Sequence, residues 1–333
     1  MSRRSSLVPF AAVAALGIFL VTSARASDPV GLLLGLPPGA RAIAMGMAQG
    51  AVAEGPDAAY WNPAALAFVP FTRSASFTYS RLNGIEVFPF VFAAYAARIA
   101  EIRGAVAASF AYFDYGSTPV YADGMRTGRT FRPYEMAPAA AFGGRVTENI
   151  AIGAGFKIIR IDFTADSGRE PPSGEATSPA VDLGFLWRGR GRRVRVGASI
   201  QNLGPDLELG SMGTAYPPLR NLKLAFGARV LDLETSALTV ACDLNKPLVG
   251  REDGPRLDLG GEMSLGGRAA MRIGWRYDGW YLEDNEYTKN LPDGATTMGF
   301  GVNVKGFAFD YANAPWEVHS PRTSHHLTVS ASF

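Results

Sequence analysis

The feature of this sequence that most limits its fold is an alternation of apolar and polar residues, which recurs from about Phe71 to the C-terminus. Successive side chains of a β-strand point to opposite faces, so this pattern gives each strand one apolar face and one polar face. The last segment shows it clearly, with apolar residues at Leu327, Val329, Ala331 and Phe333. The chain is therefore predicted to be all-β over most of its length.

The residues on the polar faces indicate which β-fold to expect. A soluble sandwich or propeller would also alternate. In this chain, however, the polar positions mix small residues with charges of both signs, and the opposite positions are apolar with aromatic residues toward the strand ends. That combination is typical of a transmembrane barrel with a wet interior. The charged residues at these inward positions are Lys157, Asp182, Arg188, Arg195, Lys223, Asp243, Asp258, Glu262, Arg272, Arg276 and Asp310.

The alternating segments predict an antiparallel transmembrane β-barrel of about fourteen strands, an even number that suits a bacterial single-chain barrel. Short connections such as Thr147-Glu148 and Gly266-Gly267 would lie at one end, and long, turn-rich loops at the other. The long loops are expected at 116–133, 164–178, 205–218 and 280–294. The strands are expected to start near residues 71, 87, 103, 134, 149, 179, 192, 219, 237, 255, 268, 295, 306 and 323.

The N-terminus has the order of a secretory signal. Arg3 and Arg4 precede an apolar stretch over residues 7–21, and Ala24-Arg25-Ala26 supplies the small residues of a cleavage site. The apolar stretch is shorter than the roughly 20 residues of a spanning helix. Residues 1–26 are therefore expected to be a cleaved signal peptide. No later apolar run is long enough for a spanning helix, so a membrane-inserted chain must cross with strands.

Residues 27–69 differ from the rest of the chain because they are rich in glycine and alanine and do not alternate. Asn62 before Pro63 predicts a helix N-cap followed by proline at the first helical position, with a short helix through Leu66. A segment with such small side chains cannot form its own core. We expect it to be a helical or irregular plug in the lumen of the barrel formed by residues 70–333.

The runs at 39–46 and 57–67 resemble the N-terminal hallmark of the PorV/PorQ family of outer-membrane proteins. Residues 199–205 and 309–312 resemble later parts of the same family. The resemblance implies a barrel similar to the FadL fatty-acid channel, with fourteen strands and an N-terminal hatch that contains an Asn-Pro-Ala motif. The hatch residues carried over by position are Gly39, Arg41, Met45, Gly46, Asp57, Trp61, Asn62, Pro63 and Ala64.

Two functions are compatible with this reading. The first is FadL-like passage of hydrophobic small molecules across the outer membrane. The second is a type IX secretion-linked role, in which the barrel is a shuttle or surface-attachment component that binds exported proteins. Both place the protein in the outer membrane of a Gram-negative-type bacterium, with outer-membrane lipid and the barrel assembly machinery as partners. The terminal aromatic residue, Phe333, is expected to be the assembly signal.

No catalytic, cofactor or metal site is predicted, and the chain is not expected to be an enzyme. His325 and His326 are adjacent on a strand and must point to opposite faces, and no serine lies in a nucleophile-elbow pattern. The 32 Lys and Arg residues nearly balance the 30 Asp and Glu residues, which argues against a nucleic-acid surface. The basic run at 188–193 could bind nucleic acid or lipopolysaccharide phosphate, but it lies at a predicted hairpin turn and is interpreted as a solvated basic tip. Cys242 is interpreted as a small outward-facing residue.

Overall fold

The structure of the chain is a computed structural model. It describes residues 30–83, 87–122, 125–164, 174–189, 191, 193–209, 214–249, 255–277, 294–315 and 323–333. The predicted signal peptide, His319 and most of the predicted loop at 280–294 lie outside the described residues.

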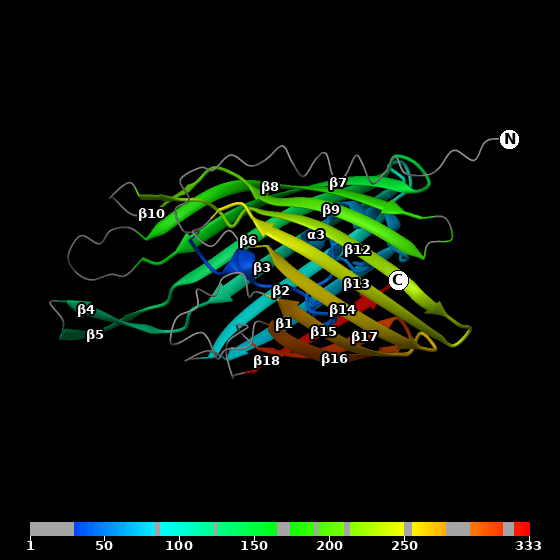
Figure 1. Ribbon diagram of the computed structural model, residues 1–333. Coiled ribbons are helices and arrows are strands. Elements are labelled where there is room, and N and C mark those ends of the chain that lie inside the picture. Colours follow the sequence, from blue (N-terminus) through cyan, green and yellow to red (C-terminus); the bar gives the residue numbers. More distant parts are fainter. Residues whose placement is uncertain are drawn as a thin grey trace.

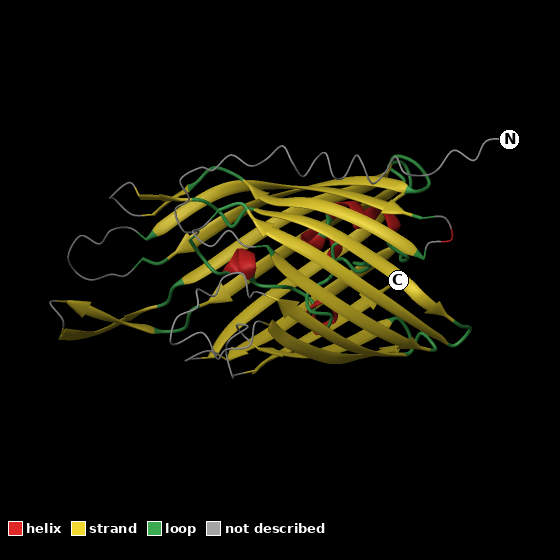
Figure 2. Cartoon of the chain, in the orientation of Figure 1, coloured by secondary structure: helices red, strands yellow, loops and turns green. Residues whose placement is uncertain are grey.

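The barrel strands pair in one closed antiparallel sheet, as Figures 1 and 2 show. Fourteen strands of the described chain take part, so the predicted fold class is confirmed. The largest error in the predicted strand starts is at β8, which begins at Glu175 rather than near residue 179. The strands are β1 (Arg73–Asn83), β2 (Val87–Ile99), β3 (Gly104–Asp114), β6 (Tyr134–Arg145), β7 (Ile150–Asp162), β8 (Glu175–Arg188), β9 (Val194–Leu203), β12 (Asn221–Asp232), β13 (Ser236–Pro247), β14 (Arg256–Leu265), β15 (Ala269–Tyr277), β16 (Gly294–Val304), β17 (Phe307–Pro315) and β18 (Thr323–Ser332).

The first and last strands close the barrel. β1 pairs with β18 from Ser74 opposite Ser332 to Arg81 opposite His325. Beyond the last pair, the Arg73 backbone N–H donates to the Phe333 carbonyl at 2.8 Å, and the Phe333 N–H donates to the Arg73 carbonyl at 2.9 Å. Every barrel strand therefore has a partner on each side, as a bilayer requires, because lipid offers no hydrogen bonds to a free edge.

The side chains face as the alternation predicts. Inward charges such as Lys157, Lys223 and Asp243 are buried, whereas outward apolar residues such as Phe156 and Phe226 are exposed on the wall. Cys242 lies between the inward-facing Ala241 and Asp243 on β13, and so belongs to the outward set. The alternation fails near the end of β12, where the pairing with β13 shifts register between Arg229 and Leu231.

Two of the predicted long loops contain strands. The segment at 116–133 forms a hairpin of β4 (Thr118–Ala122) and β5 (Met125–Phe131), and the segment at 205–218 contains the pair β10 (Leu207–Leu209) and β11 (Thr214–Tyr216). These pairs extend beyond the barrel at one end, away from the C-terminus (Figure 1). These strands are short and lie within turn-rich segments, so they lack the long alternation that marks the barrel strands.

Four short helices precede the barrel and lie inside it (Figure 2). Asn62 caps the last of them as predicted, although this helix is of the 3-10 type and runs two residues past Leu66. None of the described helices is long and apolar enough to span a membrane. The helices are η1 (Leu33–Gly35), α2 (Ala40–Ala44), α3 (Ala58–Trp61) and η2 (Pro63–Phe68).

The outer face of β12 contacts lipid, so a charge placed there should destabilise the barrel by an amount that depends on its depth in the membrane. Phe226 lies in the middle of the strand and Val230 near its end at the short turns, and both are exposed on the outer wall. Phe226→Arg should lower the free energy of unfolding by roughly 2–4 kcal/mol, whereas Val230→Arg should cost roughly 0–1 kcal/mol, because the charge then lies near the interface. Equilibrium unfolding in liposomes measures the free energy of unfolding of both variants. An equal loss of stability in the two would contradict this placement of β12 in the bilayer.

The C-terminal residue supports a prediction about assembly. Phe333 pairs with Arg73 through its backbone while its side chain is exposed. Phe333→Ala keeps the backbone pairing but removes the ring, so it should reduce the heat-modifiable protein in the outer membrane if the ring is the assembly signal. Phe333→Tyr should restore it. Full assembly of Phe333→Ala would show that the backbone pairing alone is sufficient.

Candidate functional site

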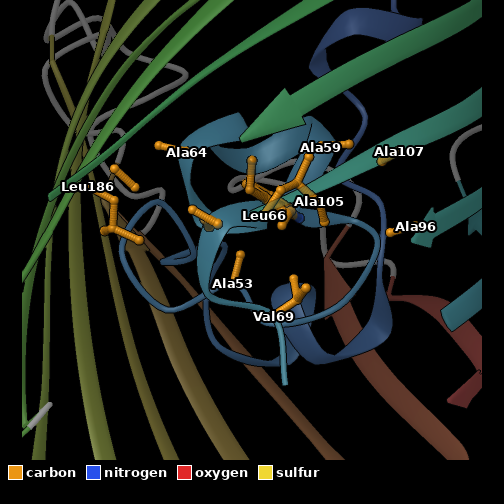
Figure 3. Packing of buried hydrophobic residues seen from close by; sticks show 14 of the residues in the cluster. Ala53, Ala59, Ala64, Leu66, Val69, Ala96, Ala105, Ala107 and Leu186 are labelled. Carbon is orange, nitrogen blue, oxygen red and sulfur yellow. The ribbon is translucent and has the colours of Figure 1, made fainter. Parts of the chain in front are cut away.

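The segment that fills the lumen, residues 30–72, is called the hatch here. Its central part packs through alanines against small residues of β2 and β3, and Leu66 is fully buried in this cluster. Figure 3 shows these contacts, with Ala64 and Leu66 of the hatch close to Ala105 and Leu186 of the wall. Small side chains on both surfaces let the hatch backbone approach the barrel closely.

Asn62 fixes one side of the hatch to the wall. Its side-chain oxygen accepts from the Ala64 N–H at 3.1 Å, and its amide nitrogen donates to the carbonyls of Gly50 at 2.8 Å and Phe185 at 3.1 Å. A Cβ added at Gly184 on β8 would lie 2.2 Å from the Asn62 side chain. Asn62 is completely buried, so these partners satisfy an amide that water cannot reach.

Gly46 holds another part of the hatch against the wall, on β14–β16. Its φ of +62° lies in the left-handed region, and an added Cβ would lie 2.5 Å from the Leu259 carbonyl oxygen. The Gly46 N–H donates to the Thr297 hydroxyl at 3.0 Å. Met45, just before it, is fully buried beside the inward-facing Ala241. The hatch is therefore held between β6–β8 on one side and β14–β16 on the other.

Arg41 joins the hatch to a buried ionic network. Its guanidinium donates to the two carboxylate oxygens of Glu262 from Nε at 2.8 Å and Nη2 at 2.9 Å, and Nη1 donates to the Val52 carbonyl at 3.1 Å. Glu262 in turn binds Arg272 at 2.7 Å, and Arg272 binds Asp310 at 2.6 Å. Two cations and two anions alternate, so the network is formally neutral. Because the bidentate geometry is specific, it fixes the position of α2 in the lumen.

Wall side chains also accept hydrogen bonds from the hatch backbone. The carboxylate of Asp243 accepts from the N–H groups of Gln49 at 2.9 Å and Gly50 at 2.7 Å, and Lys223 pairs with the same oxygen at 3.2 Å. Near the other end of the hatch, Glu135 accepts from the N–H groups of residues 32 and 33 at 2.8 and 3.0 Å. Because the hatch is irregular, these backbone N–H groups have no acceptor within it, and the wall carboxylates accept their hydrogen bonds instead.

The remaining motif residues line a cavity of about 320 Å³ beside the ionic network. Gly39, at a φ of +89°, lies against Asp57, which accepts a hydrogen bond from Ser76 at 2.9 Å. Desolvation raises the pKa of the Asp57 carboxyl above its ordinary value, and the bond from Ser76 opposes that shift. The Trp61 ring has the Lys223 ammonium 5.0 Å from its centre, and its indole N–H donates to the Pro38 carbonyl at 3.2 Å.

The nine motif residues therefore occupy three separate places in the hatch rather than one ligand site. Asn62, Pro63 and Ala64 lie against β6–β8, Met45 and Gly46 lie against β14–β16, and the others surround the small cavity. Among the described residues, no group of three or more His, Cys, Asp or Glu is arranged to hold a metal ion. The arrangement holds the hatch against the wall at several points inside the lumen.

The two ends of the lumen differ in chemistry. At the long-loop end, Leu33 packs with Phe90, Phe92 and Phe113. Leu34 packs there with aliphatic residues of β7 and β10. The cavity beside these two leucines is only about 30 Å³. At the short-turn end, a cavity of about 1000 Å³ is lined by many arginines. At the long-loop end the lumen is thus apolar and filled beside β2, β3 and β7, while β12–β14 present polar residues such as Asn221 and Arg256 to a separate cavity of about 80 Å³. At the short-turn end the lumen is charged and open.

Sequence reasoning identified the hatch motif and the inward charges but not how they pair. Glu262 and Asp243 were expected to line a wet interior, yet they bind the hatch directly. Glu135 and the leucines of η1 were not singled out at all. The available signal was an acidic residue at the start of the inward face of β6, followed by small residues, but no periodicity identifies its partner.

Gly46 supports a prediction with a matched control. Gly46→Ala and Gly267→Ala both place a side chain at a φ near +60°, but only at Gly46 does the new Cβ meet backbone atoms. The shared strain should cost about 1 kcal/mol. The overlap should cost roughly 1–3 kcal/mol more at Gly46 and displace the hatch. The free energy of unfolding measures the difference in stability, and protection of the hatch from protease measures its displacement. Equal values for the two variants would contradict the close contact at Gly46.

The fold is similar to solved structures that include two toluene transporters and a FadL homologue. The Ralstonia pickettii toluene transporter TbuX has a TM-score of 0.57 and 15% identity, with 89% of this chain and 98% of that chain covered. The Pseudomonas putida toluene transporter TodX has a TM-score of 0.56 and 13% identity, with 88% and 96% covered. A Pseudomonas aeruginosa FadL homologue has a TM-score of 0.57 and 14% identity, with 90% and 99% covered. At these identities the likeness shows the fold alone.

A search of curated proteins found no match. The family model for the type IX secretion system protein PorV matches residues 28–254, which is more than half of the chain and includes the hatch. The match and the FadL-like neighbours agree with a non-enzymatic barrel in the outer membrane of a Gram-negative-type bacterium. The chain belongs to the PorV family of outer-membrane β-barrel proteins.

Proposed function

We propose that the protein is a FadL-like passage for hydrophobic small molecules across the outer membrane, closed by the hatch. The observation that carries this proposal is the apolar lining at the long-loop end, where Phe90, Phe92 and Phe113 are buried inside the barrel. A lumen that conducts ions or sugars needs polar walls at its entrance. Aromatic walls instead suit an apolar solute.

The residues of η1 occupy the place where such a solute would bind. Leu33 and Leu34 fill the space between the apolar walls, and the Glu135 carboxylate holds the backbone of this turn. The phenolic O–H of Tyr115 donates to the same carboxylate. A solute would therefore compete with leucine side chains for the apolar walls, so displacement of η1 would open the passage. The common architecture with toluene transporters supports this solute class.

A second candidate is a role in type IX secretion, as a shuttle or attachment component that binds exported proteins. The family match favours it, because the matched model describes a type IX secretion system protein. The β4–β5 hairpin supplies a surface for such a partner, since it projects beyond the barrel at the long-loop end (Figure 1). That end faces the outside of the cell in barrels of this kind.

The double variant Leu33→Ala and Leu34→Ala tests the channel proposal. It removes apolar volume from η1 but keeps the backbone hydrogen bonds to Glu135. Uptake of a hydrophobic dye by cells should rise several-fold if the leucines close the passage. The same cells are assayed for surface proteins released into the medium, which the channel proposal expects to be unchanged.

Replacement of residues 118–131 by a short turn is the matched test of the second candidate. It leaves the lumen intact, so dye uptake should stay at the wild-type level. Altered release of surface proteins after this change, together with unchanged dye uptake in the leucine variant, would reject the channel proposal in favour of the secretion role. Heat-modifiability of each variant verifies that the barrel still folds.

A further inference from the structure

The cavity at the short-turn end is called the arginine vestibule here. It has a volume of about 1000 Å³, and its floor is the end of the hatch at residues 67–70. Its walls come from the turns that join β2 to β3, β6 to β7, β8 to β9 and β12 to β13. Six arginines near these turns line it: Arg98, Arg103, Arg145, Arg188, Arg193 and Arg229.

The vestibule carries an excess of positive charge. Arg195 also lines it, which makes seven arginines, and the carboxylates are the three of Glu54, Glu148 and Asp232. Seven minus three leaves a formal charge of +4 from the described lining residues, although the whole chain has a formal charge of only +2. The ionic network around Arg41 is neutral by comparison. The positive charge is therefore concentrated at one mouth of the barrel.

Two arginines already converge on one anionic group. Arg103 and Arg145 both pair with Glu148, whose side chain is 76% exposed. The Arg145 Nε also donates to the Arg103 carbonyl at 3.2 Å, which holds the two residues together. Exposed ion pairs contribute only about 0–1 kcal/mol, so an anion with more charge can replace the glutamate. Glu148 thus marks the position where an external anionic group would bind.

A third arginine is held by an aromatic ring. The guanidinium of Arg188 lies 4.6 Å from the centre of the Phe68 ring on the vestibule floor. The Asn149 amide donates to the Arg188 carbonyl at 2.6 Å, which ties the β6–β7 turn to the end of β8. Stacking leaves the edge of a guanidinium able to donate hydrogen bonds. The turns therefore present several ordered cations around one chamber.

We propose that the arginine vestibule binds, from the periplasmic side, a compact polyanion that carries several phosphate groups. Short turns face the periplasm in barrels of this type. The volume lies in the range of small-ligand sites, and the hatch closes the floor, so a ligand would stop there. The arginines come from four turns, so one phosphate cannot reach them all. Each phosphate can accept paired hydrogen bonds from a guanidinium, the recognition that arginine favours over lysine.

The test uses the full barrel in nanodiscs of phosphatidylcholine, with tripolyphosphate as the probe and calorimetry as the readout. Replacing both Arg103 and Arg145 by Gln should lower its affinity about tenfold or more. Glu148→Gln should raise it a few-fold, because it removes the competing carboxylate. Arg268→Gln is the control, since Arg268 is an exposed arginine in the β14–β15 turn at the same end but outside the vestibule. It should bind as the wild type does.

Three outcomes would overturn the proposal. The first is the absence of tripolyphosphate binding to the wild type, and the second is equal binding by the double Arg103 and Arg145 variant. The third is tighter binding of an oligoglutamate peptide of equal charge, which would indicate an acidic protein segment. A second arm, with the two-phosphate lipid cardiolipin in the nanodiscs, distinguishes a lipid headgroup from a free polyphosphate as the source of the phosphates. Competition with tripolyphosphate there indicates a lipid headgroup, and no competition indicates a free polyphosphate.

Discussion

The pairing of β1 with β18 is the constraint on which the rest of the structure depends. A bilayer leaves no partner for an unpaired backbone group, so the sheet must close on itself. Closure through Arg73 and Phe333 forces the side chains of every strand into an outer and an inner set. The outer set meets lipid and is apolar. The inner set encloses a lumen that side chains of the wall do not fill, and this space is what the hatch occupies.

The hatch fits this lumen through small side chains and buried polar contacts rather than through a core of its own. Glycines and alanines bring its backbone against β6–β8 and β14–β16, and wall carboxylates accept its unpaired N–H groups. The hatch lies between the apolar, filled region beside β2, β3 and β7 and the arginine vestibule at the short-turn end. The proposed hydrophobic passage concerns the first region, and the proposed polyanion site concerns the second. The two proposals therefore involve different ends of the lumen.

Much of the barrel could be predicted because its rules are local. The period of two set the strands and their facing, so the inward positions of Lys223, Asp243 and Glu262 were correct before any pairing was known. Asn62 before Pro63 similarly predicted a capped helix, since capping involves only neighbouring residues. Local patterns failed at β4–β5 and β10–β11, whose short strands lie within turn-rich segments, and at the bulge in β12, which no composition marks.

The sequence by itself determined the number of strands, the faces they present and the segment that lies inside them, because side-chain alternation and small-residue composition act along the chain. Only the tertiary structure decided which wall residues hold the hatch. Arg41 and Glu262 are 221 residues apart, and Leu33 and Glu135 are 102 apart. The arginine vestibule likewise forms from four separate turns. Such groupings follow from barrel closure and strand register, which place distant residues side by side.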